Sequence, residues 1–415
     1  MSIDFPNKEG VDMTQEEYSS KNLDHLGIVS TICDEINLVQ TIDRHIPSDS
    51  RALLTTGECV KLMVLNGLGF TSKPLYLEAE FFRSRPVERF LGRSIEVDEI
   101  TDDRLGLCLD RCFKGNCSQI FGLVATKAAD RFAVDTRFRH LDSTSVSVQG
   151  EYNTEDGIGL MQLGHSKDHR PDLKQFMISL ICSQDGDVPL LAKTIAGNTS
   201  DQTDFGNTLA NIKDQLKESE APCYYVADSA LYTEKNLIKI SSSVLWISRV
   251  PERIAAAKRL IWNVHKERMK DVGGGYFCEE FGSIYAGVKQ RWILVYSEAA
   301  FCREKKTLDR NIIKEEQLVK KDLKTLSSQL FSCENDAHKS IADKQKKYKY
   351  HQFTNIEVVA INTKNGRGRP KKNEEIKKVY KITGQVQKEE AKIKLAIQSK
   401  GKFIIASNEL DHSAH

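Results

Sequence analysis

Two aspartates in strand-like segments carry the clearest chemical signal of this sequence. Asp142 lies in the alternating run 141–148, and Asp228 follows directly after the apolar run 224–227. Carboxylates on neighbouring strands can share hard cations such as Mg²⁺, which prefer oxygen ligands and bind together with substrate phosphates. One aspartate beside a strand is more often a cap or a turn residue. The pair, together with the order of the strands around it, predicts a divalent-metal site for phosphoryl transfer on nucleic acid.

The segment 131–251 is expected to form the sheet that positions these aspartates. Its β-branched residues and turn residues predict strands at 139–148, 176–182, 188–195, 224–227 and 244–250. Helices are predicted to begin near Asp201 and Thr233. The resulting order βββαβαβ is that of a ribonuclease-H-like mixed sheet in an α/β protein. Asp142 would lie on the first strand and Asp228 at the end of the fourth.

The segment 1–130 is predicted to be a separate N-terminal helical domain. Thr55 and Glu58 have the spacing of a capping box before the apolar run 59–70, and Thr101 is placed to cap a further helix. Two readings of this domain stay open, namely a structural or dimerising bundle and a domain that binds DNA ends.

The segment 252–400 is expected to be an α+β insertion domain, followed by a return strand of the core in 401–415. A charged amphipathic stretch at 303–348 predicts one long helix or a hairpin of two. A strand pair is predicted at 285–297, another strand at 356–361, and the return strand at 403–406. The charge of the helix most simply marks a solvated face.

A basic loop precedes the second strand of the sheet. Lys167, Arg170 and Lys174 could contact DNA phosphates, because basic side chains dominate binding to the DNA backbone. A surface loop closed by salt bridges explains the same residues equally well. His165 and His169 have a spacing that could suggest zinc, but Pro171 and the loop context argue against a helical pair of ligands.

A second basic segment lies within the predicted insertion domain. Arg367, Arg369 and Lys371 belong to the stretch Arg-Gly-Arg-Pro-Lys, a flexible basic sequence of the kind that lies in a narrow minor groove. An ordinary basic loop is the alternative.

The composition bounds these interpretations. The 415 residues exceed a usual single core, and 40% of them are hydrophobic, which is enough for two or three domains. The formal net charge is only +2, so a nucleic-acid footprint must come from local clusters. No bilayer-length apolar run and no signal-peptide pattern occur, which predicts a cytoplasmic protein without membrane contact. The ten cysteines include no CxxC pair and are expected to be free thiols.

Several ordered motifs resemble those of one protein family. The chain resembles bacterial insertion-sequence transposases of the DDE type in the segments HLDSTSVSVQGEY, GHSKDHRPDLKQ, VADSALYT, WISRVP and GKFIIASNELD. The resemblance implies a ribonuclease-H-like domain interrupted by an insertion domain, Mg²⁺ or Mn²⁺ as cofactor, and double-stranded DNA, both transposon ends and target, as partner. It also implies that Asp142 is the first catalytic acid and Asp228 the second. The oligomeric state stays open, with a homodimer as one alternative.

One part of the family pattern is missing. The family carries a third acid, a glutamate on a helix downstream of the strand that here is expected at 403–406, and this sequence ends at His415 before such a helix. The expectation is therefore a C-terminally truncated transposase with impaired end cleavage and strand transfer. The alternatives are a non-catalytic DNA-binding remnant, which occupies transposon ends or inhibits the full-length enzyme, and an inactive remnant.

Overall fold

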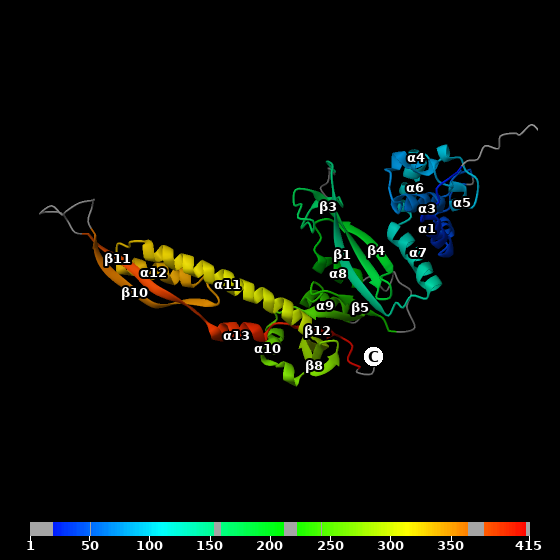
Figure 1. Ribbon diagram of the computed structural model, residues 1–415. Coiled ribbons are helices and arrows are strands. Elements are labelled where there is room, and N and C mark those ends of the chain that lie inside the picture. The colour runs from blue at the N-terminus through cyan, green and yellow to red at the C-terminus, as the bar shows by residue number, and fades with distance from the viewer. Residues whose placement is uncertain are drawn as a thin grey trace, which may run out of the picture. The chain divides into compact units, whose positions relative to one another are not determined.

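The computed structural model of the chain describes residues 20–49, 51–152, 159–210, 222–241, 243–363 and 377–411. The chain divides into two compact units, Met1–Val226 and Ala227–His415. Figure 1 shows helices at the beginning of the first unit and strands with helices in the rest of the chain. The predicted α/β class, with N-terminal helices and a mixed sheet, is confirmed.

The first unit begins with a group of helices around a shared apolar core. Its helices are α1 (Leu26–Glu35), α2 (Leu38–His45), α3 (Thr56–Gly67), α4 (Glu78–Arg83), α5 (Val87–Leu91), α6 (Asp102–Lys114) and α7 (Cys117–Phe132). The capping box predicted at Thr55 and Glu58 is formed, and Thr101 accepts the hydrogen bond from the Arg104 N–H that caps α6. Leu62 and Phe82 are fully buried in the core that α3, α4 and α6 share.

The sheet of the first unit follows these helices. Its elements are β1 (Phe138–Val148), β2 (Gln162–Leu163), β3 (Lys174–Ser183), β4 (Pro189–Ala196), α8 (Asp201–Ala210) and β5 (Tyr224–Ala227). The strand β1 lies between β3 and β5, and both β2 and β4 pair with β3. The antiparallel register of β1 and β3 places Asp142 opposite Leu180. Successive residues of a strand face opposite sides, so Leu141 and Ser143 are buried while Asp142 is exposed.

The second unit contains further strands that pair with one another, together with short helices. Its elements are α9 (Glu234–Ile240), β6 (Leu245–Val250), α10 (Ala255–Asn263), β7 (Lys270–Gly273), β8 (Tyr276–Tyr285), β9 (Val288–Ser297) and β12 (Lys402–Ser407). The strand β12 pairs antiparallel with both β6 and β9. Trp246 and Trp292 are buried in this unit, so neither side chain is open to stack on a nucleotide base.

A long helix and a two-stranded sheet form the remaining part of the second unit. Its elements are α11 (Glu298–Ser328), α12 (Glu334–Gln345), β10 (His351–Thr363), β11 (Lys377–Lys388) and α13 (Glu390–Gln398). In Figure 1 the yellow α11 runs along the hairpin of β10 and β11. Leu326, Phe331, Ala337 and Ile382 form the small core between these elements. The charged stretch predicted at 303–348 is therefore a hairpin of two helices.

The strand pair predicted at 285–297 is wrong in its boundaries. The segment holds one strand, β9, and its partner β8 begins earlier, at Tyr276. Ala286 and Gly287 connect the two strands, and their φ angles of 54° and 73° are those of a two-residue turn with both central residues in the left-handed region. Such turns usually contain Asn-Gly or Asp-Gly, so Ala-Gly gives a weak signal in the sequence.

Candidate metal-binding carboxylates

Asp142 presents its carboxylate on the exposed face of β1. Its Oδ1 accepts a hydrogen bond of 2.8 Å from the backbone N–H of Ser143. That bond orients the carboxylate and leaves lone pairs of both oxygens available to a ligand. The pKa of the Cys182 thiol on β3 is raised, first by burial and then by the carboxylates of Asp187 and Asp142. The negative charge of Asp142 therefore contributes to the raised pKa of a thiol on the neighbouring strand β3.

The residues next to Asp142 tie β1 to two other segments. The buried Ser143 hydroxyl donates to Oδ1 of Asp201 over 2.6 Å, which fixes the first residue of α8 against β1. From the loop before β3, the Lys167 ammonium donates to the Ser143 carbonyl, and the Lys167 N–H donates to the Ser145 hydroxyl over 3.2 Å. An exposed positive charge is thereby held against the backbone one residue from Asp142.

Asp228 is the first residue after β5 and is also exposed. Its Oδ1 accepts a hydrogen bond of 2.7 Å from the N–H of Ala230, and its carbonyl accepts one of 2.8 Å from the Ser248 hydroxyl. The short Asx-type bond and the contact with β6 fix the turn that follows β5. The carboxylate is thus oriented by the backbone, as in Asp142.

Side-chain contacts define how β1 and β5 lie against each other. The rings of Phe138 and Tyr224 stack with their centroids 5.3 Å apart, and the next residue on each strand is also in contact, because Arg139 donates to the Tyr225 hydroxyl over 2.8 Å. The contacts advance in the same chain direction on both strands, as they do in a parallel pair. Burial raises the pKa of Tyr225, which the nearby Arg139 partly offsets.

Neither aspartate forms an ion pair with any residue that the structure describes. Over the same residues, no group of three or more His, Cys, Asp or Glu side chains gathers into a ligand set. The donors present at Asp142 and Asp228 are carboxylate oxygens, which suit Mg²⁺ or Mn²⁺ rather than a soft metal.

The basic residues of the loop before β3 have different surroundings. Arg170 forms a two-bond ion pair with Asp172, at 2.9 and 2.7 Å, and this hydrogen bonding lowers the pKa of the Asp172 carboxyl. Lys174 donates to the carbonyls of Glu151 and Tyr152 at 2.9 and 2.8 Å. It lies opposite Val148, six residues along β1 from Asp142. Of the three, Lys167 is therefore the one that the structure brings next to Asp142.

The second basic segment, with Arg367, Arg369 and Lys371, lies outside the described residues. Over the part of the chain that is described, no helix has the length and apolar character needed to cross a membrane.

One group of charged residues was missed from the sequence. Arg104 and Arg111 lie on one face of α6 and, together with Arg51, line a pocket in the helical part of the first unit. Their spacing of seven residues, with Leu107 and Cys108 between them, was a detectable signal, because residues three, four and seven apart share a helix face. The sequence does not show that Asp49 and residues 51–55 line the pocket opposite that face.

Comparisons with known proteins give two matches. A family described as a domain of unknown function (DUF4277) matches residues 18–126, the helical part of the first unit. The comparison with curated proteins gave no match. Among solved structures, the chain is similar to a piggyBac transposase in a synaptic complex with hairpin DNA, with 12% identity and a TM-score of 0.30. That match covers 66% of this chain and 57% of the transposase chain. The function is therefore argued from the residues of this chain.

Proposed function

We propose that this chain is a DNA-processing protein of the DDE transposase type, in which Asp142 and Asp228 bind divalent metal ions beside a phosphodiester of DNA. The proposed fold is ribonuclease-H-like, because the element order βββαβαβ, apart from the two-residue β2, runs from β1 to β6. The reaction would be metal-dependent phosphoryl transfer, namely cleavage at a transposon end and strand transfer to target DNA.

The contact between β1 and β5 carries this proposal. Phe138 on β1 stacks on Tyr224 on β5. Asp142 lies four residues after Phe138, and Asp228 lies four residues after Tyr224. An even number of residues along a strand returns the side chain to the same face, and equal numbers along parallel strands lead to the same level. The two aspartates therefore hold equivalent positions relative to the contact between Phe138 and Tyr224, which supports the proposal that they act as a pair of metal ligands.

The roles of the two aspartates follow from their hydrogen bonds. Each has one oxygen held by a backbone N–H, from Ser143 or Ala230, so each carboxylate is pre-oriented and can offer lone pairs to a cation. When bound, Mg²⁺ or Mn²⁺ supplies activation of the attacking oxygen and stabilisation of the leaving oxygen. The aspartates act as ligands only, and they transfer no proton.

DNA contact is proposed for the basic residues. Lys167 is the strongest candidate, because the residue is exposed and its ammonium is held one residue from Asp142, where it can neutralise a phosphate charge. Arg170 and Lys174 would contact phosphates further along the same loop, and Arg367, Arg369 and Lys371 remain predictions from the sequence.

A nicking assay tests the proposed function. Purified protein is incubated with a supercoiled plasmid that carries the DNA flanking the gene, over a titration of Mg²⁺ and Mn²⁺. We expect metal-dependent nicking that falls at least about a hundredfold in Asp142→Asn and Asp228→Asn, because each substitution removes a ligand charge without changing the side-chain shape. Asp187→Asn is the matched control, since Asp187 is an exposed aspartate with a φ of 52° that asparagine tolerates.

The outcome separates the two functions considered for this chain. Nicking that both variants lose and the control retains supports the enzyme. Salt-sensitive binding to the flanking DNA without nicking favours the non-catalytic DNA-binding protein. Nicking at wild-type rates in both variants contradicts the assigned ligands.

A further inference from the structure

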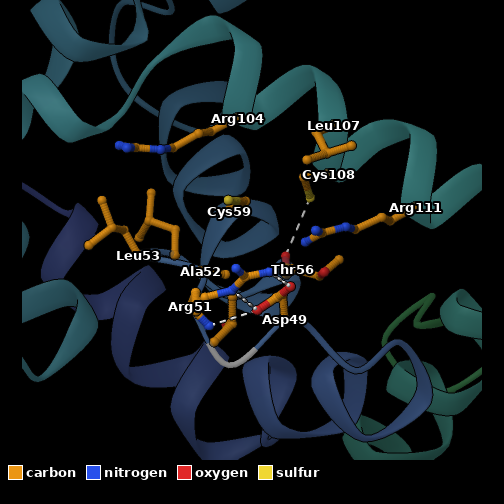
Figure 2. Close-up of a pocket in the computed structure, with 12 residues that line it drawn as sticks. Asp49, Arg51, Ala52, Leu53, Thr56, Cys59, Arg104, Leu107, Cys108 and Arg111 are labelled. Carbon is orange, nitrogen blue, oxygen red and sulfur yellow. Dashed lines mark hydrogen bonds and ion pairs between the residues drawn. The ribbon is translucent and has the colours of Figure 1, made fainter.

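A pocket of about 340 Å³ lies in the helical part of the first unit, and none of its lining residues belongs to β1, the strand of Asp142. Figure 2 shows side chains of α6 on one side of it and the loop before α3 on the other. Arg51, Leu53, Thr56, Arg104, Leu107 and Arg111 are among the residues that line it. Its volume is at the lower end of the range for small-ligand sites, so it suits one small ligand and excludes a DNA duplex.

The charges of this pocket favour an anion. Three arginines line it, against a single aspartate. Arg51 is paired with Asp49 at 3.2 Å, and Arg104 is paired with Glu99. Arg111 is half-buried, points toward Thr56 in Figure 2, and forms no hydrogen bond or ion pair with any residue in the described part of the chain. Its guanidinium therefore keeps five donors for a ligand.

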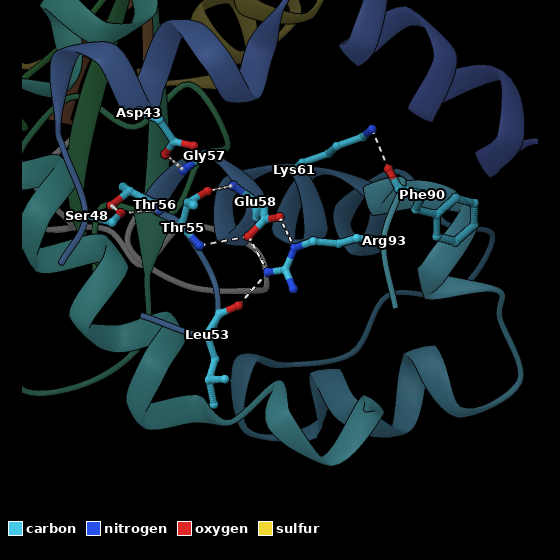
Figure 3. A network of polar contacts seen from close by, with 10 residues as sticks. All are labelled: Asp43, Ser48, Leu53, Thr55, Thr56, Gly57, Glu58, Lys61, Phe90 and Arg93. Carbon is cyan, nitrogen blue, oxygen red and sulfur yellow. Dashed lines mark hydrogen bonds and ion pairs between the residues drawn. The ribbon is translucent and has the colours of Figure 1, made fainter. Parts of the chain in front are cut away.

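The backbone N–H groups at the start of α3 are not available to that ligand. Thr55 N–H donates to Glu58, Thr56 N–H to Ser48, and Gly57 N–H to Asp43, at 2.8, 2.9 and 2.7 Å. Figure 3 shows this network, in which Arg93 also joins Glu58 to the Leu53 carbonyl. The network fixes the loop that forms one wall, and it leaves recognition of an anion to the arginines.

The pocket also has an apolar edge. Leu53 and Leu107 line it from the loop and from α6, and each is 51% exposed. Exposed leucines on two sides of a charged pocket can cover the sugar or base of a ligand whose charged group lies among the arginines. A ligand with a compact anionic group and a flat or apolar body satisfies both features.

We propose that this pocket binds the phosphate of a single nucleotide, with Arg111 as the principal phosphate ligand and with Leu53 and Leu107 against the nucleoside. The planar guanidinium donates paired hydrogen bonds that match phosphate oxygens. The nucleotide is either free in solution or the phosphorylated 5′ end of a DNA strand, because both present the same group. The proposal does not depend on Asp142 or Asp228.

Binding measurements without divalent metal test the proposal. The full chain is titrated in EDTA with deoxyadenosine 5′-monophosphate, with inorganic phosphate, and with a short single strand that carries a 5′-phosphate or a 5′-hydroxyl. Arg111→Gln is expected to weaken binding of the phosphorylated probes about tenfold or more. Arg89→Gln, an exposed arginine on α5 outside the pocket, is expected to leave binding unchanged. Leu107→Ala should weaken nucleotide binding and spare inorganic phosphate.

The probes also distinguish the two sources of the nucleotide. Tighter binding of the 5′-phosphorylated strand than of the free nucleotide assigns the pocket to DNA ends, and equal or tighter binding of the free nucleotide assigns it to a soluble ligand. Thermal unfolding of Arg111→Gln should stay close to that of the wild type, because Arg111 forms no side-chain hydrogen bond or ion pair with a described residue and only adds to the charge near Asp49. The proposal is wrong if no probe binds saturably, or if Arg111→Gln and Arg89→Gln behave alike.

Discussion

Glu58 and Asp142 are two carboxylates of the first unit with opposite surroundings. Glu58 is nearly buried, and its two oxygens bind the Arg93 guanidinium at 2.7 and 2.8 Å and the Thr55 N–H. Burial alone would raise its pKa, but the Arg93 and Thr55 hydrogen bonds outweigh burial, and the pKa is lowered. Asp142 is exposed, has one backbone hydrogen bond, and has no cationic partner among the described residues.

The difference separates a carboxylate that stabilises the fold from one that, in the proposed function, binds a metal ion. Arg93 and the Thr55 N–H bind Glu58 at the start of α3, beside the pocket lined by Arg51, Arg104 and Arg111. The ion pair with Arg93 therefore already neutralises the charge of Glu58. The carboxylate of Asp142 is oriented by the backbone and forms no ion pair with a residue in the described ranges. Glu78 is a third case, because it is 1% exposed, forms no ion pair with any residue that the structure describes, and burial raises its pKa to about 7.

The largest expected effect on stability concerns Glu78. Its folded pKa of about 7 exceeds the ordinary value of 4.5, so its contribution to stability is fully present below pH 4.5 and is lost as the pH rises through about 7. Glu78→Gln should remove this loss and raise the free energy of unfolding at pH 8 by about 3 kcal/mol. Denaturant unfolding of both proteins at pH 5 and pH 8 measures the effect.

The control for Glu78 is Glu80→Gln, an exposed glutamate on the same helix. It should leave the pH dependence of the wild type intact. A Glu78→Gln protein that shows the same loss of stability between pH 5 and pH 8 as the wild type would rule out Glu78 as its source.

A smaller loss is expected at Glu58. Glu58→Ala removes the capping box of α3 and leaves Arg93 without its carboxylate, which should cost about 2 kcal/mol, since Arg93 is partly exposed and solvent screens the pair. Because the pKa of Glu58 is lowered, the wild-type contribution is present above pH 4.5 and is lost as the pH falls through the folded pKa. Chemical unfolding at pH 7 measures it, with Glu96→Ala, an exposed glutamate, as control. Equal losses in the two variants would contradict the role of Glu58.

The smallest expected effect concerns DNA binding by Lys167. Lys167→Gln should reduce the slope of log K against log salt concentration by about 0.9, the value for one lost phosphate contact. Lys193→Gln is the control, because Lys193 is an exposed lysine on β4 of the same unit. Fluorescence anisotropy with flanking DNA at several salt concentrations gives the slope. An unchanged slope in Lys167→Gln would assign Lys167 to the structure of the loop alone.

The sequence was informative where local rules decide the structure. Thr55 and Glu58 correctly predicted the start of α3, and the β-branched runs correctly predicted β1 and β6. Helix caps and the alternation of buried and exposed residues depend only on neighbours a few positions away in the sequence. The lysine-rich strand β11 and the helix α13 were not predicted. The polar side chains of β11 face solvent, and its conformation depends on pairing with β10 and packing on α11.

The two aspartates of the candidate site could be predicted from the sequence, but the contacts around them could not. The sequence indicated Asp142 and Asp228, but the contact of Lys167 with the Ser143 carbonyl and the bond from Ser143 to Asp201 join segments 24 and 58 residues apart. Such contacts depend on how the loop and α8 return to β1. The pocket lined by Arg51, Arg104 and Arg111 likewise requires residues 51–55 to lie against α6, which no local pattern specifies.

Direct measurement of metal binding tests the central claim most closely, because it does not require the correct DNA substrate. Mn²⁺ binding to the full chain is followed by electron paramagnetic resonance, with Asp142→Asn, Asp228→Asn and the control Asp187→Asn. We expect saturable binding that each of the first two variants weakens at least about tenfold and that the control retains. Wild-type Mn²⁺ affinity in both Asp142→Asn and Asp228→Asn would contradict a metal site shared by these two carboxylates.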